Sequence, residues 1–582
     1  MDFELSKYQK QILNEFQNSN DNLFISALAG ASKTFMLTEI SKLIKNYSVF
    51  IAFNKVIQLE LSEKIKNPKF RTYTFNGLGY QILLKNAEEQ GISNVIIDKY
   101  KSNNICRKIA SQNILGYKQL DSDLKQDLVR DLTTLYELCR SYMIEFNNIK
   151  RINMIVDNNN LFMGEEIEVP DNLDRLLTLI DEMNMYQFEH EGIISFSDQL
   201  YITVKKLQNK EWKVPGYLKF FNILVDECQD TSILQQQLIY YIRRENARIV
   251  IVGDKFQSIY YFNGADQYSI DHLKKTYNMK ELKLPICYRC PSSHLNYVNK
   301  KFPYIGIEPA PNAKIGKVKR ILLGEIKDYV KEGDFILSRK NKDLCEVVLD
   351  ILDMGIPIYF KDVQFVEKII KKIEGFKRKT RNIYELKDYI IEDRDKCKNK
   401  LKNAVETFLN EETENDKSSH DDIEKYTFCN EVVDLFDCII VLLRNYLSKN
   451  DNGSCTIGKF IDYVKKMLNT TSRKNAVVCS SIHQAKGSET NNVFVLNEAE
   501  PMIYNYMSPE QKQQEINLSY VSLTRAKENL YLVEMPKKED EEFRADFNGG
   551  ALVIKKANQI IDEFDIDYEQ EDFDIELEDM LP

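Results

Sequence analysis

The chain has 582 residues, of which 43% are hydrophobic and 29% charged, and its formal net charge is −10. Its 21 glycines and 13 prolines are too few for a collagen-like or largely disordered chain, and no apolar run approaches the ~20 residues that cross a bilayer. The first residues lack the basic start and apolar stretch of a signal peptide, and eleven cysteines in so long a chain are typical of a reducing compartment. We therefore expect a cytoplasmic protein that is neither secreted nor bound to a membrane.

The negative charge is concentrated near the C-terminal end. Residues 546–582 contain 12 acidic residues against Lys555 and Lys556, so this segment accounts for the whole net charge. The preceding residues hold equal numbers of acidic and basic side chains, which leaves room for a basic groove and an anionic partner.

Two stretches alternate short apolar runs with polar helical ones, as an α/β sheet does. We expect one core from residues 1–85 and 190–275, and a second from 276–360 and 470–545, with mainly helical insertions at 86–189 and 361–469 and an acidic tail at 546–582. The strands expected in the first core are Leu23–Ala27, Val49–Phe53, Phe221–Val225 and Ile249–Val252. Those expected in the second are Asp334–Ser338, Val493–Leu496 and Leu530–Glu534.

The segment Leu23–Leu37 has the pattern of a strand, a tight loop and a helix. Loops of this kind bind phosphates through backbone N–H groups at a helix N-terminus, with a lysine on the β- and γ-phosphates and a hydroxyl on Mg²⁺. Lys33 and Thr34 would fill the last two roles, and the loop residues that would supply the backbone are Ala29, Gly30, Ala31 and Ser32. Because Ala27 and Ser32 stand where the usual pattern has glycine, the segment by itself fits an ordinary strand, turn and helix equally well.

Two further apolar runs end in polar residues. Phe221–Asp230 indicates a buried strand followed by Asp226, which would bind Mg²⁺, and Glu227, which would polarise an attacking water. Charges directly after a buried strand need partners, which makes a purely structural role costly. A third run, Arg248–Gln257, ends in a glutamine that could sense the γ-phosphate. Together these runs predict a site for ATP and Mg²⁺.

Taken in order from Leu5 to Val533, the motifs resemble those of UvrD/Rep-type superfamily 1 DNA helicases. The segments that carry the resemblance, besides those above, are Leu5–Gln9, Ala52–Lys55, Thr74–Gly77, Ile194–Asp198, Leu284–Arg289, Asp334–Asn341, Ser481–Glu489 and Glu515–Lys527. The family's fold implies two RecA-like P-loop NTPase cores, each interrupted by a mainly helical insertion domain. The nucleotide contacts implied by the resemblance are Gln9 on adenine, Tyr288 stacked on the base, and Glu489.

The resemblance also implies two arginines that act on the γ-phosphate, Arg289 and the arginine finger Arg525. Phosphoryl transfer needs charge stabilisation from more than one side, and an inserted arginine is a common device for it. Both arginines lie in the expected second core, whereas Lys33 and Glu227 lie in the first. We therefore expect a catalytic site that is complete only when the two cores close.

Contacts to single-stranded DNA are implied for Asn54, Phe75 and His483. Tyr260 and Phe262 follow Gln257 and are placed to stack on bases, each stack contributing ~1–3 kcal/mol. Ordinary core positions stay the alternative for the aromatic residues, as does a neutral, hydrogen-bonded imidazole for His483.

Several residues depart from the family pattern. Ser32 adds a side chain near the phosphates, and the positions where the family often has His, Arg, Asn and Leu hold Asn76, Asn263, Cys287 and Ser488. These departures leave the DNA contacts and the rate of turnover open. The pair Cys287 and Cys290 has CxxC spacing, but a structural zinc needs four ligands and no second pair accompanies it.

We predict an ATP-dependent helicase that moves along single-stranded DNA and separates tailed duplex DNA. The resemblance implies 3′ to 5′ polarity. Repair, replication, recombination and anti-phage roles all stay open, as do a bacterial and a viral or phage-encoded source. Two alternatives stay open: a nucleotide-gated DNA-binding or scaffold protein with impaired hydrolysis, and an RNA-directed helicase. The acidic tail could be a solvated segment, could dock on a partner protein, or could lie in the DNA groove as a mimic.

Overall fold

The structure, a computed structural model, divides the chain into two compact units. The first comprises Met1–Tyr288 with Gly306–Glu308 and Glu414–Phe428, and the second the rest. The described residues are 4–159, 161–162, 170–260, 264–266, 268–377, 379–411, 419–450, 455–468, 476–499, 501–503 and 509–536. The predicted acidic tail and Phe262 lie outside the described residues.

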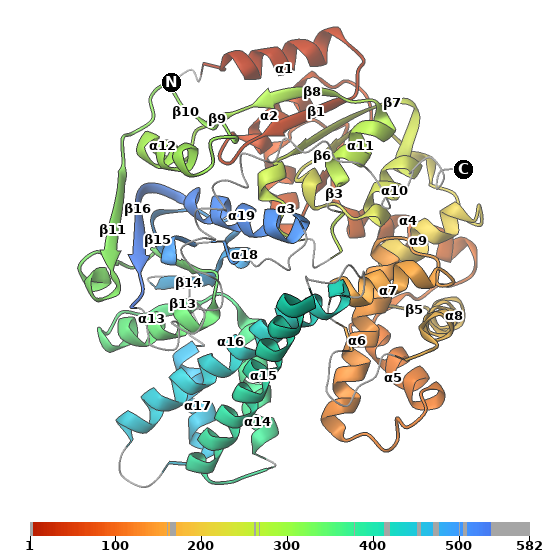
Figure 1. Ribbon diagram of the computed structural model, residues 1–582. Helices are drawn as coiled ribbons and strands as arrows, with labels where there is room; N and C mark the ends of the chain where they lie inside the picture. The colour runs from red at the N-terminus through yellow and green to blue at the C-terminus, as the bar shows by residue number, and fades with distance from the viewer. Residues whose placement is uncertain are drawn as a thin grey trace. The chain divides into compact units, whose positions relative to one another are not determined.

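The first unit is built on a six-stranded sheet with the order β3-β2-β6-β7-β1-β8, in which all neighbours are parallel (Figure 1). Its strands are β1 (Leu23–Ala27), β2 (Ser48–Ala52), β3 (Phe70–Thr74), β6 (Phe220–Val225), β7 (Arg243–Gly253) and β8 (Lys280–Leu284). The predicted α/β fold class is confirmed. The division into domains stays a proposal, and its boundary at 275/276 falls ahead of β8, which pairs with β1 and completes the first sheet.

Alternation along the buried strands distributes the core of this unit over both faces of the sheet. Leu23 and Ile25 of β1 pack on one face, and Phe24 packs on the other. The first face is covered by α1 (Lys7–Asn18), α2 (Lys33–Leu43) and α3 (Lys55–Lys64). The second is covered by α4 (Phe75–Glu89), α9 (Asp198–Gln208), α10 (Ile233–Ile242) and α11 (Ser269–Tyr277). This arrangement exposes the carboxyl edge of the sheet, where β1, β6 and β7 end in the polar residues of the sequence motifs.

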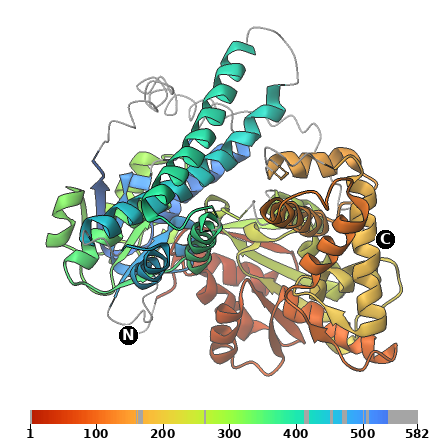
Figure 2. The same cartoon turned by 90° about the horizontal axis from the view of Figure 1, so that it is seen from below.

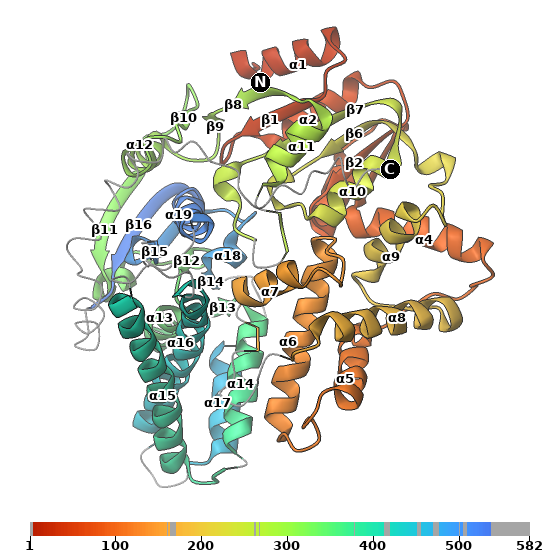
Figure 3. The same cartoon turned by 45° about the vertical axis from the view of Figure 1, so that its right-hand side comes forward.

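The helices between α4 and α9 form a separate hydrophobic core and gather beside the first sheet (Figures 2 and 3). They are α5 (Lys101–Asn113), α6 (Ser122–Ser141), α7 (Ile149–Asn158) and α8 (Leu173–Glu191), and the short strands β4 (Ile96–Ile97) and β5 (Ile193–Ile194) pair in parallel beside them. A buried ion-pair network centred on Asp198 joins α5, α6 and α8 to the start of α9.

The second unit holds another parallel six-stranded sheet, with the order β11-β16-β15-β12-β14-β13. Its strands are β11 (Lys317–Leu322), β12 (Phe335–Ser338), β13 (Ile358–Phe360), β14 (Val477–Ser481), β15 (Thr490–Leu496) and β16 (Ala526–Glu534). The helices connected directly to them are α12 (Ser292–Lys301), α13 (Asn341–Asp353), α18 (Ile482–Ala485) and α19 (Pro509–Leu523). Two-residue strands, β9 (Ile286–Cys287) and β10 (Glu308–Pro309), pair near the end of β8.

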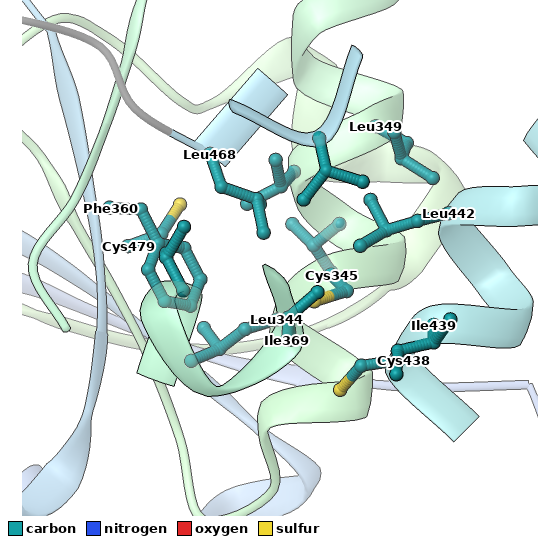
Figure 4. Packing of buried hydrophobic residues seen from close by; sticks show 14 of the residues in the cluster. Leu344, Cys345, Leu349, Phe360, Ile369, Cys438, Ile439, Leu442, Leu468 and Cys479 are labelled. Carbon is teal, nitrogen blue, oxygen red and sulfur yellow. The ribbon is translucent and has the colours of Figure 1, made fainter. Parts of the chain in front are cut away.

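Helices α14 (Val363–Phe376), α15 (Ile383–Glu411), α16 (Ser419–Lys449) and α17 (Ile457–Leu468) are inserted between β13 and β14. Figure 4 shows how α14, α16 and α17 share a core with α13 and the sheet, through Ile369, Ile439 and Leu468 among others. The thiols of Cys345, Cys438 and Cys479 are buried in this core as small apolar fillers.

Candidate active site

The loop between β1 and α2 has the backbone shape of an anion-binding turn. Gly30 and Ser32 both have a left-handed conformation, with φ of 67° and 62°, and the side chain of Ser32 does not cap the helix that follows. Ala29, before Gly30, and Ala31, between Gly30 and Ser32, are buried. Helix N-termini attract anions, so this geometry suits the phosphate contact that the sequence indicates, and the contact itself stays a prediction.

Lys33, the first residue of α2, lies among three carboxylates. Its Nζ donates to Glu227 Oε2 at 2.6 Å, and Asp226 and Asp254 are close enough to act on its charge. Burial by itself lowers the pKa of Lys33, but the three carboxylates outweigh burial and raise it, so the lysine stays charged. Asp254, at the end of β7, was not predicted as a site residue, although its place after a buried strand is the same signal that identified Asp226.

Asp226 is 3% exposed and its pKa is raised to about 7. Burial is the main cause, followed by the charge of Glu227, while Lys33 and the hydroxyl of Thr34, which donates to Asp226, oppose the shift. Lys33 and Thr34 compensate the negative charge of this buried carboxylate only in part, which favours a further cation beside Asp226. Carboxylate and hydroxyl oxygens are ligands that Mg²⁺ accepts, so Asp226 and Thr34 are suited to hold this ion.

Two glutamines connect the acidic loop to the next strand. Gln229 of η2 (Cys228–Asp230) donates to Glu227 Oε2 at 2.7 Å and accepts from the Asp254 N–H at 3.1 Å. Gln257 of η3 (Lys255–Gln257) donates to Asp254 Oδ2 at 2.6 Å. The predicted sensor Gln257 is thus linked to Glu227 through Asp254 and Gln229, and the role of Gln229 could not be read from the sequence.

Gly253 explains how these two loops come so close together. A Cβ at this position would lie 2.6 Å from both Cys228 Sγ and Gln229 Oε1, so a larger residue would push the loops apart.

Gln9 and Tyr288 lie together in the first unit, beside the phosphate loop. Gln9 is fully buried and its Oε1 accepts from the Ser6 N–H at 2.9 Å and the Tyr288 hydroxyl at 3.4 Å. Among the residues that the structure describes, its buried Nε2 has no hydrogen-bond partner, an arrangement that suits a ligand with an acceptor atom at this point. The Tyr288 N–H also donates to the Gly30 carbonyl at 2.9 Å, which ties the predicted base contact to the loop.

The residues present in this unit fit a nucleotide with Mg²⁺. Gln9 offers an unused donor, the loop and Lys33 offer positive charge, and Thr34 with Asp226 offers oxygen ligands. Among the described residues, no three His, Cys, Asp or Glu side chains group as a metal site of their own. Mg²⁺ is commonly held by one or two protein oxygens together with phosphates and water.

In the second unit, Glu489 is the centre of an ion-pair cluster. It pairs with Arg289 Nε and with Lys527 Nζ, the latter at 2.8 Å, and Arg289 Nη1 also donates to the Thr524 carbonyl at 3.2 Å. Burial raises the pKa of Glu489, but Arg289 and Lys527 outweigh it and the net pKa is lowered. The structure therefore brings the predicted Arg289 and Glu489 together as an ionised pair.

Arg525 is 1% exposed. Its Nε donates to the Val521 carbonyl at 2.8 Å and its Nη2 to Thr524 Oγ1 at 3.2 Å, both within the end of α19. The guanidinium is therefore held by its own helix terminus in this structure.

The candidates for nucleic-acid contact fall into different environments. Asn54 is exposed and caps α3, with its Oδ1 accepting from the Ile57 N–H at 3.0 Å. Tyr260 stacks on Phe53, with ring centroids 5.8 Å apart, and Phe53 is 40% exposed. This pair is an accessible aromatic platform. Phe53 was not predicted as a contact to DNA, because its residue type is that of the neighbouring core residues and only its burial state differs from theirs.

Phe75 and His483 are less accessible. Phe75 is 5% exposed and packs in the core between α4 and the sheet, which argues against the predicted contact with a base. His483 is half-buried, and burial, followed by the charges of Arg339 and Lys486, lowers its pKa to about 3. Burial and the two cations thus favour the neutral imidazole, and the contact of His483 with single-stranded DNA stays a prediction.

Comparison with known proteins gives two family matches. The UvrD/REP helicase N-terminal domain matches residues 5–278, and the UvrD-like helicase C-terminal domain matches residues 476–533, together more than half of the chain. The helices that the structure describes include none long and apolar enough to span a membrane.

Similar curated proteins carry helicase names. The chain is 23% identical to the ATP-dependent DNA helicase Rep of Buchnera aphidicola subsp. Acyrthosiphon pisum, over 90% of this chain and 94% of that protein. It is 21% identical to a probable DNA helicase II homolog of Mycoplasma pneumoniae, over 82% of this chain and 75% of that protein. It is 25% identical to the ATP-dependent DNA helicase PcrA of Leuconostoc citreum, over 55% of this chain and 43% of that protein.

Proposed function

The chain belongs to the UvrD/Rep-like family of ATP-hydrolysing DNA helicases, and we propose that it couples hydrolysis of ATP with Mg²⁺ to movement along single-stranded DNA in the 3′ to 5′ direction. The observation that carries the proposal is the position of Lys33, at the end of a left-handed loop and among Asp226, Glu227 and Asp254. A lysine beside several backbone N–H groups at a helix N-terminus can bind phosphates. The adjacent carboxylates can bind a metal ion and activate water.

Lys33 and Gln229 both donate to Glu227 Oε2, so the two neighbours hold this carboxylate beside the lysine. Lys33 would exchange Glu227 for phosphate oxygens, which frees Glu227 to orient and polarise a water. Mg²⁺ held by Thr34 and Asp226 would neutralise charge on the phosphates.

Arg289 and Arg525 remain proposed partners of the reaction in the second unit. Arg289 is paired with Glu489, and Arg525 is held by carbonyl and hydroxyl oxygens at the end of α19, so both guanidinium groups are kept in place by acceptors of their own unit. We propose that both stabilise the charge that develops during phosphoryl transfer.

We propose Phe53 and Tyr260 as the stacking surface for bases. The loop that carries Tyr260 follows Gln257 directly, so a change at the nucleotide site has a short covalent path to the platform. Base stacking on aromatic rings is largely independent of sequence, which suits a protein that moves along a strand.

The test is an ATPase and strand-displacement assay on two variants with matched controls. Lys33→Ala should abolish DNA-stimulated hydrolysis, while Lys42→Ala on the exposed side of the same helix should not change it. Glu227→Gln should bind ATP and fail to hydrolyse it, while the exposed Glu60→Gln should behave as the parent does. Parental turnover in either Lys33→Ala or Glu227→Gln would refute the assignment.

Polarity and nucleic-acid type need separate substrates. Duplexes with a 3′ or a 5′ single-stranded tail, each made in DNA and in RNA, should be unwound only when the tail is 3′ and is DNA. Unwinding from RNA tails alone would favour the RNA-directed alternative. Nucleotide-dependent DNA binding without any hydrolysis would favour the nucleotide-gated binding protein.

A further inference from the structure

A polybasic stretch in the second unit has no part in the candidate active site. Residues 368–381 contain seven lysines and arginines and one acid, Glu374. Helix α14 buries Phe365, Ile369 and Ile373 in the core of the unit, so its basic residues are directed outward. We use the name basic surface for the exposed side chains of Lys368, Lys371, Lys377, Lys379 and Arg381.

The charges of the basic surface are not neutralised within the described part of the chain. Lys368, Lys371, Lys377 and Arg381 form no ion pair there, and Lys379 has only a long one, 4.0 Å to Asp393. Helix α17 packs beside α14 and adds the exposed Lys465 and Lys466. This excess of exposed positive charge favours an anionic partner.

Exposed apolar side chains lie along the chain on both sides of the basic surface. Val363 is 52% exposed, Tyr384 57% and Tyr389 36%. A partner that combines acidic and apolar side chains would be matched better here than a purely anionic one.

We propose that residues 546–582 of this same chain dock on the basic surface. This segment has 12 acids against two bases, and its acids alternate with Phe564, Ile566, Phe573 and Ile575, among other apolar residues. Its composition is thus complementary to the basic surface both in charge and in its apolar positions.

The topology of the second sheet brings the segment within reach. All six strands are parallel, so β16 and β13 end at the same edge, and α14 starts three residues after the end of β13. The two strands are four positions apart in the sheet, roughly 19 Å at ~4.8 Å per strand. Residues 535–545 can span up to roughly 36 Å when extended, and α14 is about 21 Å long, so the acidic segment reaches the basic surface.

At low salt, residues 546–582 therefore occupy the basic surface of their own chain. Phosphate groups of a nucleic acid would compete for the same lysines, so the segment lowers the affinity of the protein for polyanions until it is displaced. This inference does not depend on ATP hydrolysis, because both the occupant and the surface lie outside the nucleotide site.

The direct test is zero-length carbodiimide crosslinking of the full chain, which joins carboxylates to lysines in contact. At ~50 mM salt, mass spectrometry should find crosslinks from residues 546–582 to Lys368 and Lys379, and their yield should fall at least ~5-fold at ~500 mM salt. In the variant Lys371→Glu, Lys377→Glu, Arg381→Glu, the same two reporter lysines should lose these crosslinks. The control variant Lys300→Glu, Lys317→Glu, Lys331→Glu, which changes exposed lysines elsewhere on the unit, should keep them.

A second measurement uses labelled single-stranded DNA. Deleting residues 546–582 should tighten binding ~3- to 10-fold at low salt, and the deletion should have no effect in the charge-reversed variant. The proposal is overturned if crosslinks spread equally over the control lysines, as for a solvated tail, or if they join only separate copies in a mixture of isotope-labelled and unlabelled chains. It is also overturned if deletion leaves DNA affinity unchanged, in which case the surface serves nucleic acid or another protein.

Discussion

Replacing Asp198 by asparagine should destabilise the first unit by roughly 3–5 kcal/mol, the loss typical of breaking a buried ion pair. Asp198 has no exposed surface, and each of its oxygens accepts two hydrogen bonds. Oδ2 accepts from Lys101 Nζ at 2.8 Å and the Ser195 N–H at 2.7 Å, while Oδ1 accepts from Asn184 Nδ2 at 3.0 Å and from Arg140. The carboxylate is the common anion of α5, α6, α8 and α9.

The charge balance around Asp198 sets the size of the effect. Lys101 and Arg140 are 1% and 2% exposed. The substitution therefore leaves two buried cations without the charged carboxylate that both of them contact. Arg140 also lies over the rings of Tyr136 and Tyr201, at 4.8 and 4.0 Å, so its guanidinium keeps these electrostatic partners when Asp198 is replaced. We therefore expect the lower end of the range, about 3 kcal/mol, a large share of the 5–15 kcal/mol that stabilises a typical domain.

The pKa of Asp198 sets the pH range over which the network stabilises the unit. Burial alone would raise the pKa of Asp198, but Arg140 and Lys101 outweigh it and hold the pKa well below 3.8. A carboxylate with a lowered pKa contributes its stability above its unfolded pKa and loses it only as the pH falls through the folded value. The difference in unfolding free energy between parent and variant should therefore stay constant from pH 5 to pH 8.

Urea denaturation and hydrogen exchange of α5 and α8 measure the effect, and Asp127→Asn is the matched control. Asp127 of α6 pairs with Arg130 at 2.7 Å, and the two side chains are 49% and 54% exposed, so this variant should lose about 1 kcal/mol or less. Equal losses in the two variants, or a loss below about 1 kcal/mol for Asp198→Asn, would show that the buried network does not anchor the insertion.

Three further outcomes are expected. Ser32→Gly should raise the unfolding free energy by about 1 kcal/mol, since glycine adopts the left-handed conformation without strain, and should leave ATPase activity equal or higher; a large loss of activity would give the serine its own role. Arg525→Lys should keep ATP affinity and lower kcat by ~10³-fold or more in a DNA-stimulated ATPase assay, with thermal melting as the check on folding. Phe53→Ala with Tyr260→Ala should remove DNA stimulation and spare basal hydrolysis, whereas Phe75→Ala should instead cost about 3–5 kcal/mol of stability as a core residue; the reverse pattern would exchange their roles.

The sequence by itself determined the buried strands and the residues that follow them. Apolar runs such as Leu23–Ala27 and Phe221–Val225 form central strands because both of their faces are covered, and burial on both faces leaves a continuous apolar signal. The proximity of Lys33 and Asp226 could be inferred from the sequence, because the strands that precede them are expected to be parallel and parallel strands end at one edge of their sheet.

The sequence did not place β8 in the first sheet. Lys280–Leu284 lies at the edge of the sheet and alternates exposed and buried residues over its last four positions, so it lacks the continuous apolar run of its neighbours. The sequence also did not predict the environments of Phe53 and Phe75. Both are phenylalanines beside a strand end, and only packing makes Phe53 a surface residue and Phe75 a core residue.

Tertiary structure alone decided which charges became partners. Asp198 is separated from Lys101 by 97 residues and from Arg140 by 58, and Glu489 from Arg289 by 200, so no local spacing links them. A strand or helix is specified by its own neighbours along the chain, because backbone geometry fixes which faces are buried. An ion pair between distant segments exists only once several elements have packed, because only then is each charge removed from water and obliged to find its counter-charge.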